Sequence, residues 1–438
     1  MVKNFRSLIV LIFFVLMVVV SWKNVIQYRG GLEKSYRDHI NNAEEYMRKE
    51  IYVDAVSEYE AALQIKKDDY DLAMTIIDLY QKLDNESSFV KACQNAISID
   101  KTDERAYIVL ADYYTSDNNM KEAVKTLLQA EENMDGNVEV ISRLEKIRGN
   151  YSIENMKYES YSNFCSPSDP KTEYAVVGLG DKYGMIDQDL DVVADLKYNS
   201  IGLLNQGVIP VCEGGEWFYV DENLYRKLVP DHSSQYLGTF SNGYAPAKFD
   251  GKYCYIDKEM KEHDPKTDYA GCFANGIAAV KSGDKWAIIN DSLELVTDYI
   301  YDDVLMDEFG FCSIYGVYWA KENEQYFLYD TKGNKLSEGY EEVKLFVSEE
   351  PAAVKIGDKW GFVSKDGELV IEASYQNANS FSLGYAPYLD NGKWGCIGEN
   401  GNILIEPTFD SMGSFAQNGY SLVEMDGVKK FAVVNIYD

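Results

Sequence analysis

KWGFVS at residues 359–364 returns as KWGCIG at residues 393–398, 34 residues further along the chain. In the C-terminal part, an aromatic residue followed by a short run of strand-forming residues occurs eight times. The intervals between these aromatics are 34, 36, 33, 40, 34, 34 and 37 residues, which indicates an array of about eight supersecondary units. The aromatics are Tyr183, Trp217, Tyr253, Trp286, Tyr326, Trp360, Trp394 and Phe431.

Two further elements accompany each aromatic. Upstream lies a run such as FSNGYAPA at residues 240–247, and downstream lies a turn dipeptide such as Asp366-Gly367 or Asn400-Gly401. Asp-Gly or Asn-Gly between apolar runs is a strong hairpin signal, so each unit is predicted to hold about three antiparallel strands. One such unit cannot bury both of its faces, so neighbours must stack. We expect an all-β array over residues 171–438, closed into a propeller-like ring, with an open β-solenoid as the alternative.

These units resemble the WG-containing repeat family, with the best matches at residues 359–361, 393–395 and 406–410. Units two and five depart from the pattern, because Phe218 and Phe327 stand where the family has glycine. The resemblance implies a bacterial surface or envelope setting. The recurring aromatics are interpreted as shared core, and a carbohydrate-stacking surface is the alternative.

A second period of 34 residues occurs within residues 36–148. Apolar residues recur there at helical spacing, which predicts two amphipathic helices in each of three repeats. This part resembles the tetratricopeptide repeat family, although Ile77 and Phe89 replace small residues in the second repeat. The final stretch, Val138 to Arg148, is expected to cap the array. The matching residues are Ala43, Tyr46, Ala55, Tyr59 and Ala62 in the first repeat and Ala111, Tyr114, Ala123 and Ala130 in the third.

The resemblance implies that the first helices of the repeats line a concave groove. One position of these helices carries Glu44, Asp78 and Asp112. Three carboxylates in a ladder would hold a basic, extended peptide. The alternative is a solvated polar face on a chain that is acidic throughout.

The N-terminus carries an apolar run of 13 residues, Leu8 to Val20, with Lys3 and Arg6 before it and Lys23 after it. A bilayer requires about 20 such residues, so the run spans only if the flanking residues extend it. We expect a single-pass anchor within residues 1–35, with the C-terminal bulk extracytoplasmic. A cleaved signal peptide is the alternative.

Between the two arrays, residues 149–170 are rich in Ser, Asn and Pro, which predicts a linker. The chain as a whole is therefore expected to be an α+β multidomain protein, with an anchor, a helical solenoid and a β array. Its formal charge of -30, from 42 Lys and Arg against 72 Asp and Glu, disfavours a nucleic-acid partner. Basic peptides, cations or polyols suit such a charge better, and the alternative is that the acidic side chains only keep the protein soluble.

No constellation of catalytic residues is evident. The histidines, His39, His232 and His263, hold no recurring position, and the seven cysteines form no closely spaced pair, so we expect buried thiols and neither a metal site nor a cofactor. Asp187, Asp189 and Asp191 imitate a calcium loop but fit a hairpin turn better. These patterns predict a membrane-anchored, non-enzymatic scaffold for protein partners. A module for cell-wall glycan or another small ligand is the alternative.

Overall fold

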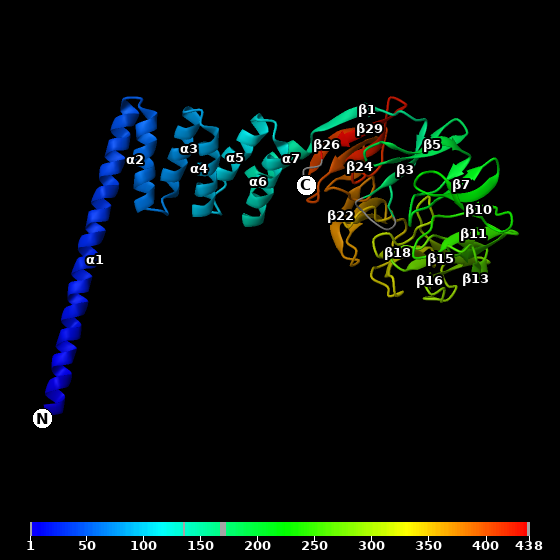
Figure 1. Cartoon of the computed structure of the whole chain (residues 1–438), viewed down its shortest axis with the longest axis horizontal. Helices are drawn as coiled ribbons and strands as arrows, with labels where there is room; N and C mark the ends of the chain where they lie inside the picture. Colours follow the sequence, from blue (N-terminus) through cyan, green and yellow to red (C-terminus); the bar gives the residue numbers. More distant parts are fainter. Residues whose placement is uncertain (1, 135, 167–171, 436–438) are drawn as a thin grey trace. The chain divides into compact units, whose positions relative to one another are not determined.

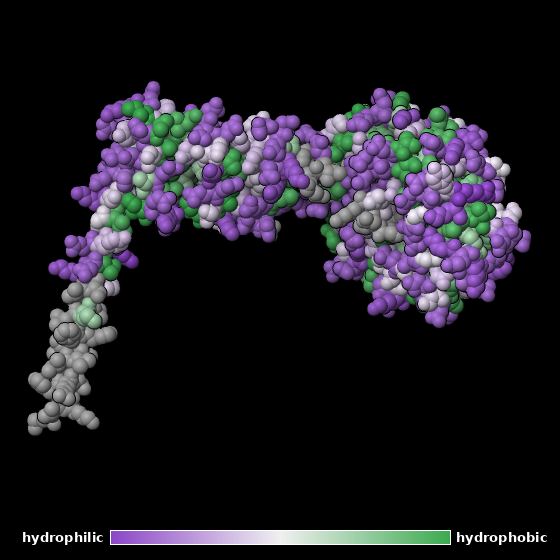
Figure 2. All heavy atoms as spheres, in the orientation of Figure 1, coloured by the Kyte–Doolittle hydropathy of each residue, from purple (hydrophilic) through white to green (hydrophobic). Residues whose placement is uncertain are grey.

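The computed structural model describes residues 2–134, 136–166 and 172–435, with the backbone alone for residues 2–16 and 18–21. The chain forms two compact units, of which the first extends to Ile147 and the second begins at Arg148. The first is helical and the second is made of small sheets (Figure 1). On the face shown in Figure 2, hydrophilic side chains cover most of each unit, with scattered hydrophobic ones between them.

The helices pair as the 34-residue period predicts. The C-terminal part of a long first helix forms the first helix of the first pair. Two further helix pairs and a final single helix come after this pair, in the tetratricopeptide-like pattern. Several of the helices are capped at their N-terminus by a polar side chain. Asn85 and Asn119, 34 residues apart, each accept a hydrogen bond from the backbone N–H three residues later. The helices are α1 (Val2–Arg48), α2 (Tyr52–Ile65), α3 (Tyr70–Lys82), α4 (Glu86–Ile99), α5 (Arg105–Ser116), α6 (Met120–Asn133) and α7 (Val138–Arg148).

Alanine side chains let the helices approach closely. Ala55, Ala62 and Ala123 are fully buried at the small positions of the repeats. In the second repeat, Ile77 and Phe89 fill the same positions and are also buried. Phe89 contacts Tyr113 with ring centroids 5.1 Å apart, so the larger side chain packs against the next repeat instead of leaving a gap.

The predicted membrane anchor is not supported. Among the described residues, no helix is long and apolar enough to cross a membrane. The helix α1 continues without a break into a charged segment, and its apolar run is shorter than the roughly 20 residues that a bilayer requires. The side chains of Leu8 to Val20, apart from Met17, lie outside the described residues. The predictions of a transmembrane helix, a membrane partner and a single-pass location are corrected on this finding.

The described residues of the second unit form eight antiparallel sheets, which we call blades 1 to 8 in chain order (Figure 1). Blades 1 to 4 hold β2 (Ser160–Tyr161), β3 (Tyr174–Leu179), β4 (Lys182–Asp187) and β5 (Val192–Tyr198); β6 (Ser200–Ile201), β7 (Ile209–Glu213), β8 (Glu216–Val220) and β9 (Arg226–Leu228); β10 (Tyr236–Leu237), β11 (Ala245–Phe249), β12 (Lys252–Ile256) and β13 (Glu262–Thr267); and β14 (Tyr269–Ala270), β15 (Ile277–Ser282) and β16 (Lys285–Asn290).

Blades 5 to 8 complete the set. They hold β17 (Asp303–Val304), β18 (Val317–Glu322) and β19 (Gln325–Asp330); β20 (Ala352–Ile356), β21 (Lys359–Val363) and β22 (Leu369–Tyr375); β23 (Asn377–Ala378), β24 (Ala386–Asp390), β25 (Lys393–Ile397) and β26 (Ile403–Phe409); and β27 (Ser411–Met412), β28 (Tyr420–Met425), β29 (Val428–Val434) and β1 (Tyr151–Asn155). The strand that comes first in the chain therefore belongs to the last blade.

The blades close into a propeller-like ring. Blade 8 is completed by β1, which pairs antiparallel with β29 over five residues. Blade 8 also contacts blade 1, because the backbone N–H of Gln417 donates to Glu173 at 2.9 Å and the rings of Tyr161 and Phe431 lie 4.9 Å apart. Closure leaves fewer unpaired strand edges than an open solenoid does. The expected linker, residues 149–170, thus contains β1 and β2, which pair at the two sides of this closure.

The glycine after the recurring aromatic has a steric cause. At Gly184, Gly361 and Gly395, a Cβ atom would lie 2.3 to 2.6 Å from a carbonyl oxygen of the neighbouring strand. Phe218 and Phe327 are tolerated because β9 and the segment after β19 do not pair there in the same way. The departures in units two and five therefore change the outer strand and leave the blade in place.

The aspartates that imitate a calcium loop form a hairpin turn. The Oδ1 atom of Asp187 accepts the backbone N–H groups of Asp189 and Asp191, both at 3.0 Å. This arrangement is an Asx-type turn, in which a side chain replaces a backbone acceptor. The preferred interpretation of this segment is confirmed.

Candidate functional site

One backbone position repeats around the centre of the ring. In seven blades, the residue just after the first strand donates its N–H to a carbonyl of the second strand, and in blade 6 the equivalent residue, Lys344, follows an isolated bridge at Val343 and donates to Ala353 of β20. We call these eight residues the inner positions, and several of them line two central cavities. Their side chains differ from blade to blade, so the wall of the centre is not uniform. The inner positions are Ser162, Gly202, Gly238, Gly271, Leu305, Lys344, Asn379 and Gly413.

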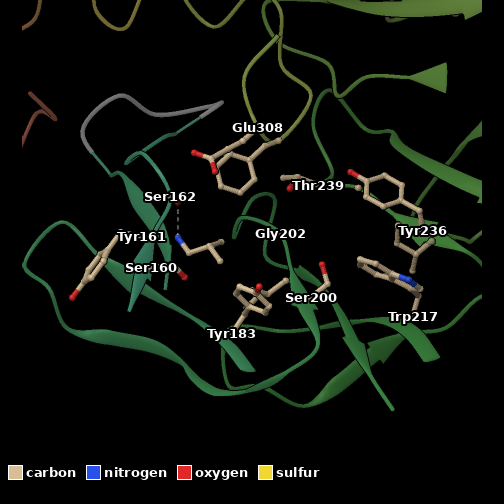
Figure 3. A pocket seen from close by; sticks show the side chains of 15 residues that line it. Ser160, Tyr161, Ser162, Tyr183, Ser200, Gly202, Trp217, Tyr236, Thr239 and Glu308 are labelled. Carbon is tan, nitrogen blue, oxygen red and sulfur yellow. Dashed lines mark hydrogen bonds between the residues drawn. The ribbon is translucent and has the colours of Figure 1, made fainter. Parts of the chain in front are cut away.

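The first cavity has a volume of about 320 Å³ and lies among blades 1 to 3 (Figure 3). Tyr183, Trp217 and Tyr236 line it, and the rings of Trp217 and Tyr236 meet edge to face at 5.5 Å. Figure 3 shows Glu308 across the cavity from Tyr183. Two of the recurring aromatics thus contribute to a cavity wall. Hydroxyl groups are also present, on Ser160, Ser162, Ser200 and Thr239.

A loop of blade 5, residues 305–316, separates the two cavities. We call it the central loop. In blade 3, five positions separate Gly238 from Gly243, whereas eleven separate Leu305 from Gly316. The six extra residues match the difference between the 40-residue interval and the usual 34. Blade 5 therefore carries an insertion that reaches into the centre of the ring.

The central loop joins distant blades. Glu308 accepts the backbone N–H of Asn163, before blade 1's second strand, at 2.8 Å, and the carbonyl of Gly310 accepts the N–H of Cys272 in blade 4 at 2.9 Å. The loop keeps its own shape through Asp307, whose Oδ1 atom accepts the N–H groups of residues 309 and 311 at 2.9 Å.

The second cavity has a volume of about 310 Å³ and lies among blades 5 to 8, the central loop and residues 162–166. Its walls combine aromatic rings with a few buried polar groups, a composition typical of small-ligand sites. Its polar side chains include Glu173, Asp307, Lys344, Asn379, Ser380 and Ser414, and its aromatic ones include Phe311, Tyr315, Trp319, Phe346, Phe415, Tyr420 and Phe431.

The carboxyl groups of the second cavity have shifted pKa values. Burial raises the pKa of Glu173 to about 7, although the N–H of Gln417 favours the carboxylate. Burial likewise raises the pKa of Asp307 to about 6, against the two backbone N–H groups that it accepts. The thiol of Cys165 lies 3.6 Å from Asp307 Oδ2, and burial, followed by this carboxylate, raises the thiol pKa well above its usual range. Both acids therefore titrate near neutral pH.

Trp319 lies beside the same cavity. Its side chain is fully buried, with Phe346 stacked on it at a centroid distance of 6.2 Å. Among the described residues, no acceptor lies within hydrogen-bond distance of its Nε1 atom, and this atom has almost no accessible area, so the donor does not open onto the space of the cavity. A buried donor without a partner is unfavourable, roughly by 1 to 3 kcal/mol.

The structure places the predicted carboxylate ladder on the first helices of successive pairs. Glu44 lies on α1, Asp78 on α3 and Asp112 on α5, and all three are exposed. Asp112 forms an ion pair with Arg143 of α7, which also contacts Glu139. The final helix therefore neutralises the third position, and the sequence pattern did not indicate this pairing.

The recurring aromatics differ in burial. Trp360 and Phe431 are almost fully buried, at 4% and 3% exposed, whereas Tyr183, Trp217 and Trp394 are half-buried. A uniform carbohydrate-stacking surface is therefore absent from the described ring, and the aromatics that reach a cavity are those of blades 1 and 2 and Phe431.

Glu173, Asp307, Glu308 and Trp319 are residues that sequence reasoning missed. Asp307 and Glu308 lie in the inserted central loop, and Trp319 stands where the other blades carry Val, Pro, Ala or Leu, so comparison of the repeats does not single them out. The 40-residue interval is the signal that would have found the central loop. The described residues contain no group of three metal-ligating side chains. The seven cysteines are free thiols, of which Cys165 is half-buried and the others are buried.

Fold and cavities together define a repeat protein of two arrays, one of tetratricopeptide-like helix pairs and one of β blades. Within the β array, residues 183–217, 235–253, 264–286, 326–360, 360–394 and 394–428 match the family model described as WG containing repeat. No curated protein matches the chain.

Solved structures of tetratricopeptide proteins resemble about a quarter of the chain. The crystal structure of MamA protein has 13% identity and a TM-score of 0.22, over 26% of this chain and 62% of that one, so less than two thirds of MamA is spanned. The first TPR of Spaghetti (RPAP3), bound to an HSP90 peptide, has 17% identity and a TM-score of 0.22, over 26% and 90%. The Yersinia enterocolitica chaperone SycD, in complex with a YopD peptide, has 19% identity and a TM-score of 0.22, over 26% and 91%.

Proposed function

We propose that this protein is a protein-binding scaffold whose helical unit binds a basic, extended peptide. The supporting observation is that Glu44 and Asp78 are exposed at the same position of successive repeats. Asp112 is occupied by Arg143, so the open acidic face belongs to the first two repeats. A peptide with two or more Lys or Arg side chains complements this face.

Electrostatics sets the expected strength of this interaction. Exposed ion pairs contribute roughly 0 to 1 kcal/mol each, so the carboxylates give orientation and association rate more than affinity. At 0.1 M salt the Debye length is about 10 Å, so the attraction between exposed charges falls off over this distance. Binding should therefore weaken as salt is added, and backbone and apolar contacts must supply the remainder.

The test is a titration of the full chain with a fluorescent peptide of alternating lysine and alanine. Glu44→Lys and Asp78→Lys together should weaken binding about tenfold or more, because attraction becomes repulsion at two sites. Glu132→Lys makes the same charge change on α6, the second helix of its pair, and should leave binding unchanged. Unchanged affinity in the double variant would overturn the proposal, as would equal binding of a glutamate-alanine peptide.

We also propose that the chain acts by binding and not by catalysis. Repeat arrays of stacked units generally present extended binding surfaces, which supports this inference. Incubation of the full chain with the lysine-alanine peptide should leave the peptide intact by mass spectrometry. Cleavage or modification that scales with protein concentration would contradict it.

A second candidate function is binding of a small saccharide in the first cavity. It is supported by three aromatic rings, Tyr183, Trp217 and Tyr236, beside several hydroxyls and Glu308. Titration with a panel of mono- and disaccharides should give saturable binding that Trp217→Ala weakens, whereas Trp394→Ala, outside the cavity, should have no effect. Absence of binding across the panel would remove this candidate.

A further inference from the structure

Peptide binding by the helical unit leaves the second cavity without a role. Three features of this cavity need explanation: a carboxyl group buried without full pairing, a lysine without an ion-pair partner among the described residues, and a wall of aromatic rings. Each of these is unfavourable or unnecessary in a cavity that only fills the centre of a ring.

Glu173 is the clearest of these features. Its side chain is 5% exposed, and Oε2 accepts the backbone N–H of Gln417 at 2.9 Å. Among the described residues, no second donor contacts this carboxylate. Asp307 also lines the cavity, and both carboxylates act electrostatically on the thiol of Cys165. Oδ1 of Asp307 accepts two backbone N–H groups, and Oδ2 faces only the weak thiol donor of Cys165. Two carboxyl groups therefore have acceptor capacity left for a ligand.

The opposite charge comes from Lys344 of blade 6, which also lines the cavity and is partly exposed. Lys344 Nζ lies 5.3 Å from the centroid of the Trp360 ring and forms no ion pair among the described residues. An oxygen atom of a ligand would accept a hydrogen bond from this ammonium group, and a negatively charged oxygen would also be attracted by its charge.

The remaining wall is apolar, and the cavity is small. Phe346, Phe415 and Phe431 contribute aromatic surface, and about 310 Å³ is at the lower end of the range for small-ligand sites. An apolar body of a few carbon atoms fits such a space, whereas a folded peptide segment does not.

We infer that the second cavity binds a small molecule that carries an ammonium group and an oxygen acceptor on an apolar body, as a free amino acid or an amino alcohol does. The ammonium group lies at Glu173 and Asp307, where charge-assisted hydrogen bonds replace lost hydration. The oxygen accepts from Lys344, and the apolar body lies against the phenylalanine rings. This site is separate from the peptide-binding face of the helical unit, so either proposal can fail alone.

Four probes with the same branched carbon skeleton test the inference: L-leucine, L-leucinol, 3-methylbutylamine, which lacks the oxygen, and 4-methylpentanoate, which lacks the ammonium group. Calorimetric titration of the full chain at pH 8 should show saturable binding of L-leucine, L-leucinol or both. Which of the two binds identifies the amino acid or the amino alcohol as the ligand type. 3-Methylbutylamine should bind several-fold more weakly, and 4-methylpentanoate at least tenfold more weakly. Equal binding of 4-methylpentanoate, or no binding of any probe, would overturn the inference.

Two variants assign the contacts. Glu173→Gln should weaken binding of the better probe about tenfold or more, because a charge-assisted bond is lost, while the amide oxygen still accepts from Gln417. The exposed Glu213→Gln is the matched control and should not change binding. Lys344→Met should remove the advantage of the oxygen-bearing probe over 3-methylbutylamine, because the methionine side chain offers the oxygen no donor. This second variant keeps the inference testable if Glu173→Gln fails to fold, and retention of the advantage would refute the role of Lys344.

Discussion

Replacement of Glu173 by glutamine should stabilise the ring at neutral and alkaline pH and lose this effect in acid. Burial raises the pKa of Glu173 from 4.5 to about 7 in the folded chain. Between these values the folded carboxyl binds more protons than the unfolded one, so the folding free energy becomes less favourable as pH rises through this window. Glutamine does not titrate, and it retains an oxygen for the N–H of Gln417.

The size of the effect follows from the two pKa values. At 1.36 kcal/mol for each pKa unit, the difference between 4.5 and about 7 corresponds to about 3 kcal/mol. The stability difference between Glu173→Gln and the parent chain should therefore change by up to about 3 kcal/mol between pH 4.5 and pH 8. The titratable groups around the cavity, Cys165, Asp307, Glu308, Tyr315 and Lys344, are common to both proteins and largely cancel in this difference.

Urea unfolding followed by tryptophan fluorescence gives the measurement. Five of the six tryptophans lie in the ring and only Trp22 lies outside it, so the signal reports the second unit. Glu213→Gln, at an exposed position, should show no pH-dependent difference from the parent chain. If the difference for Glu173→Gln stays flat from pH 4.5 to pH 8, Glu173 is not buried as described and the reasoning is refuted.

Three other changes test the ring itself. Gly395→Ala should lower the unfolding free energy by about 1 to 3 kcal/mol, because its Cβ atom would lie 2.3 Å from a carbonyl oxygen. Gly413→Ala is the control and should cost much less, because the nearest atom to its Cβ would lie at 3.7 Å. Equal unfolding midpoints of the two variants would contradict the steric account. Ile153→Asp in β1 should lower the unfolding free energy of the ring by about 1 to 3 kcal/mol. Ser152→Ala is the control and should lower it by under about 0.5 kcal/mol. An unchanged unfolding free energy in Ile153→Asp would exclude closure through β1. Iodoacetamide at pH 8 should leave the thiols of the native protein intact, because they are buried or half-buried and burial raises the pKa of Cys254, for example, to about 12. After denaturation without reductant, the reagent should modify all seven cysteines. Fewer than seven modified cysteines would indicate disulfides.

The architecture of each array could be predicted because repetition makes weak local signals add up. The recurring aromatics marked one blade each, and the turn dipeptides such as Asp366-Gly367 lie in the hairpins where they were expected. The 34-residue helical period likewise placed the helix pairs. In each case the same side chain solves the same packing problem in every unit, so one sequence is enough to see it.

Features that occur once could not be found in this way. The strand β1 repeats nothing around it, and the Ser- and Pro-containing segment that follows resembles a linker in composition, yet β1 pairs with β29 at the far end of the ring. Pairing over such a separation depends on the closure of the whole ring and not on local propensity. The central loop also occurs only once, and only the 40-residue interval indicated the insertion that carries Asp307 and Glu308.

The N-terminal prediction failed for a different reason. The 13-residue run from Leu8 to Val20 was extended by its flanks to reach a membrane-spanning length. In the structure the same flanks belong to a helix, α1, that continues into charged residues and the first repeat. Apolar composition over a short window does not distinguish these cases, because the length and context of the helix decide them.

A charge-swap titration tests most directly whether the helical unit is a peptide-binding scaffold. The full chain and its Glu44→Lys, Asp78→Lys double variant are each titrated with a lysine-alanine peptide and with a glutamate-alanine peptide of the same length. The parent chain should prefer the lysine peptide, and the double variant should prefer the glutamate peptide, because Glu44 and Asp78 are the open charges on this face. If both proteins show the same preference, the basic peptide does not bind at these carboxylates, and the proposed function is wrong.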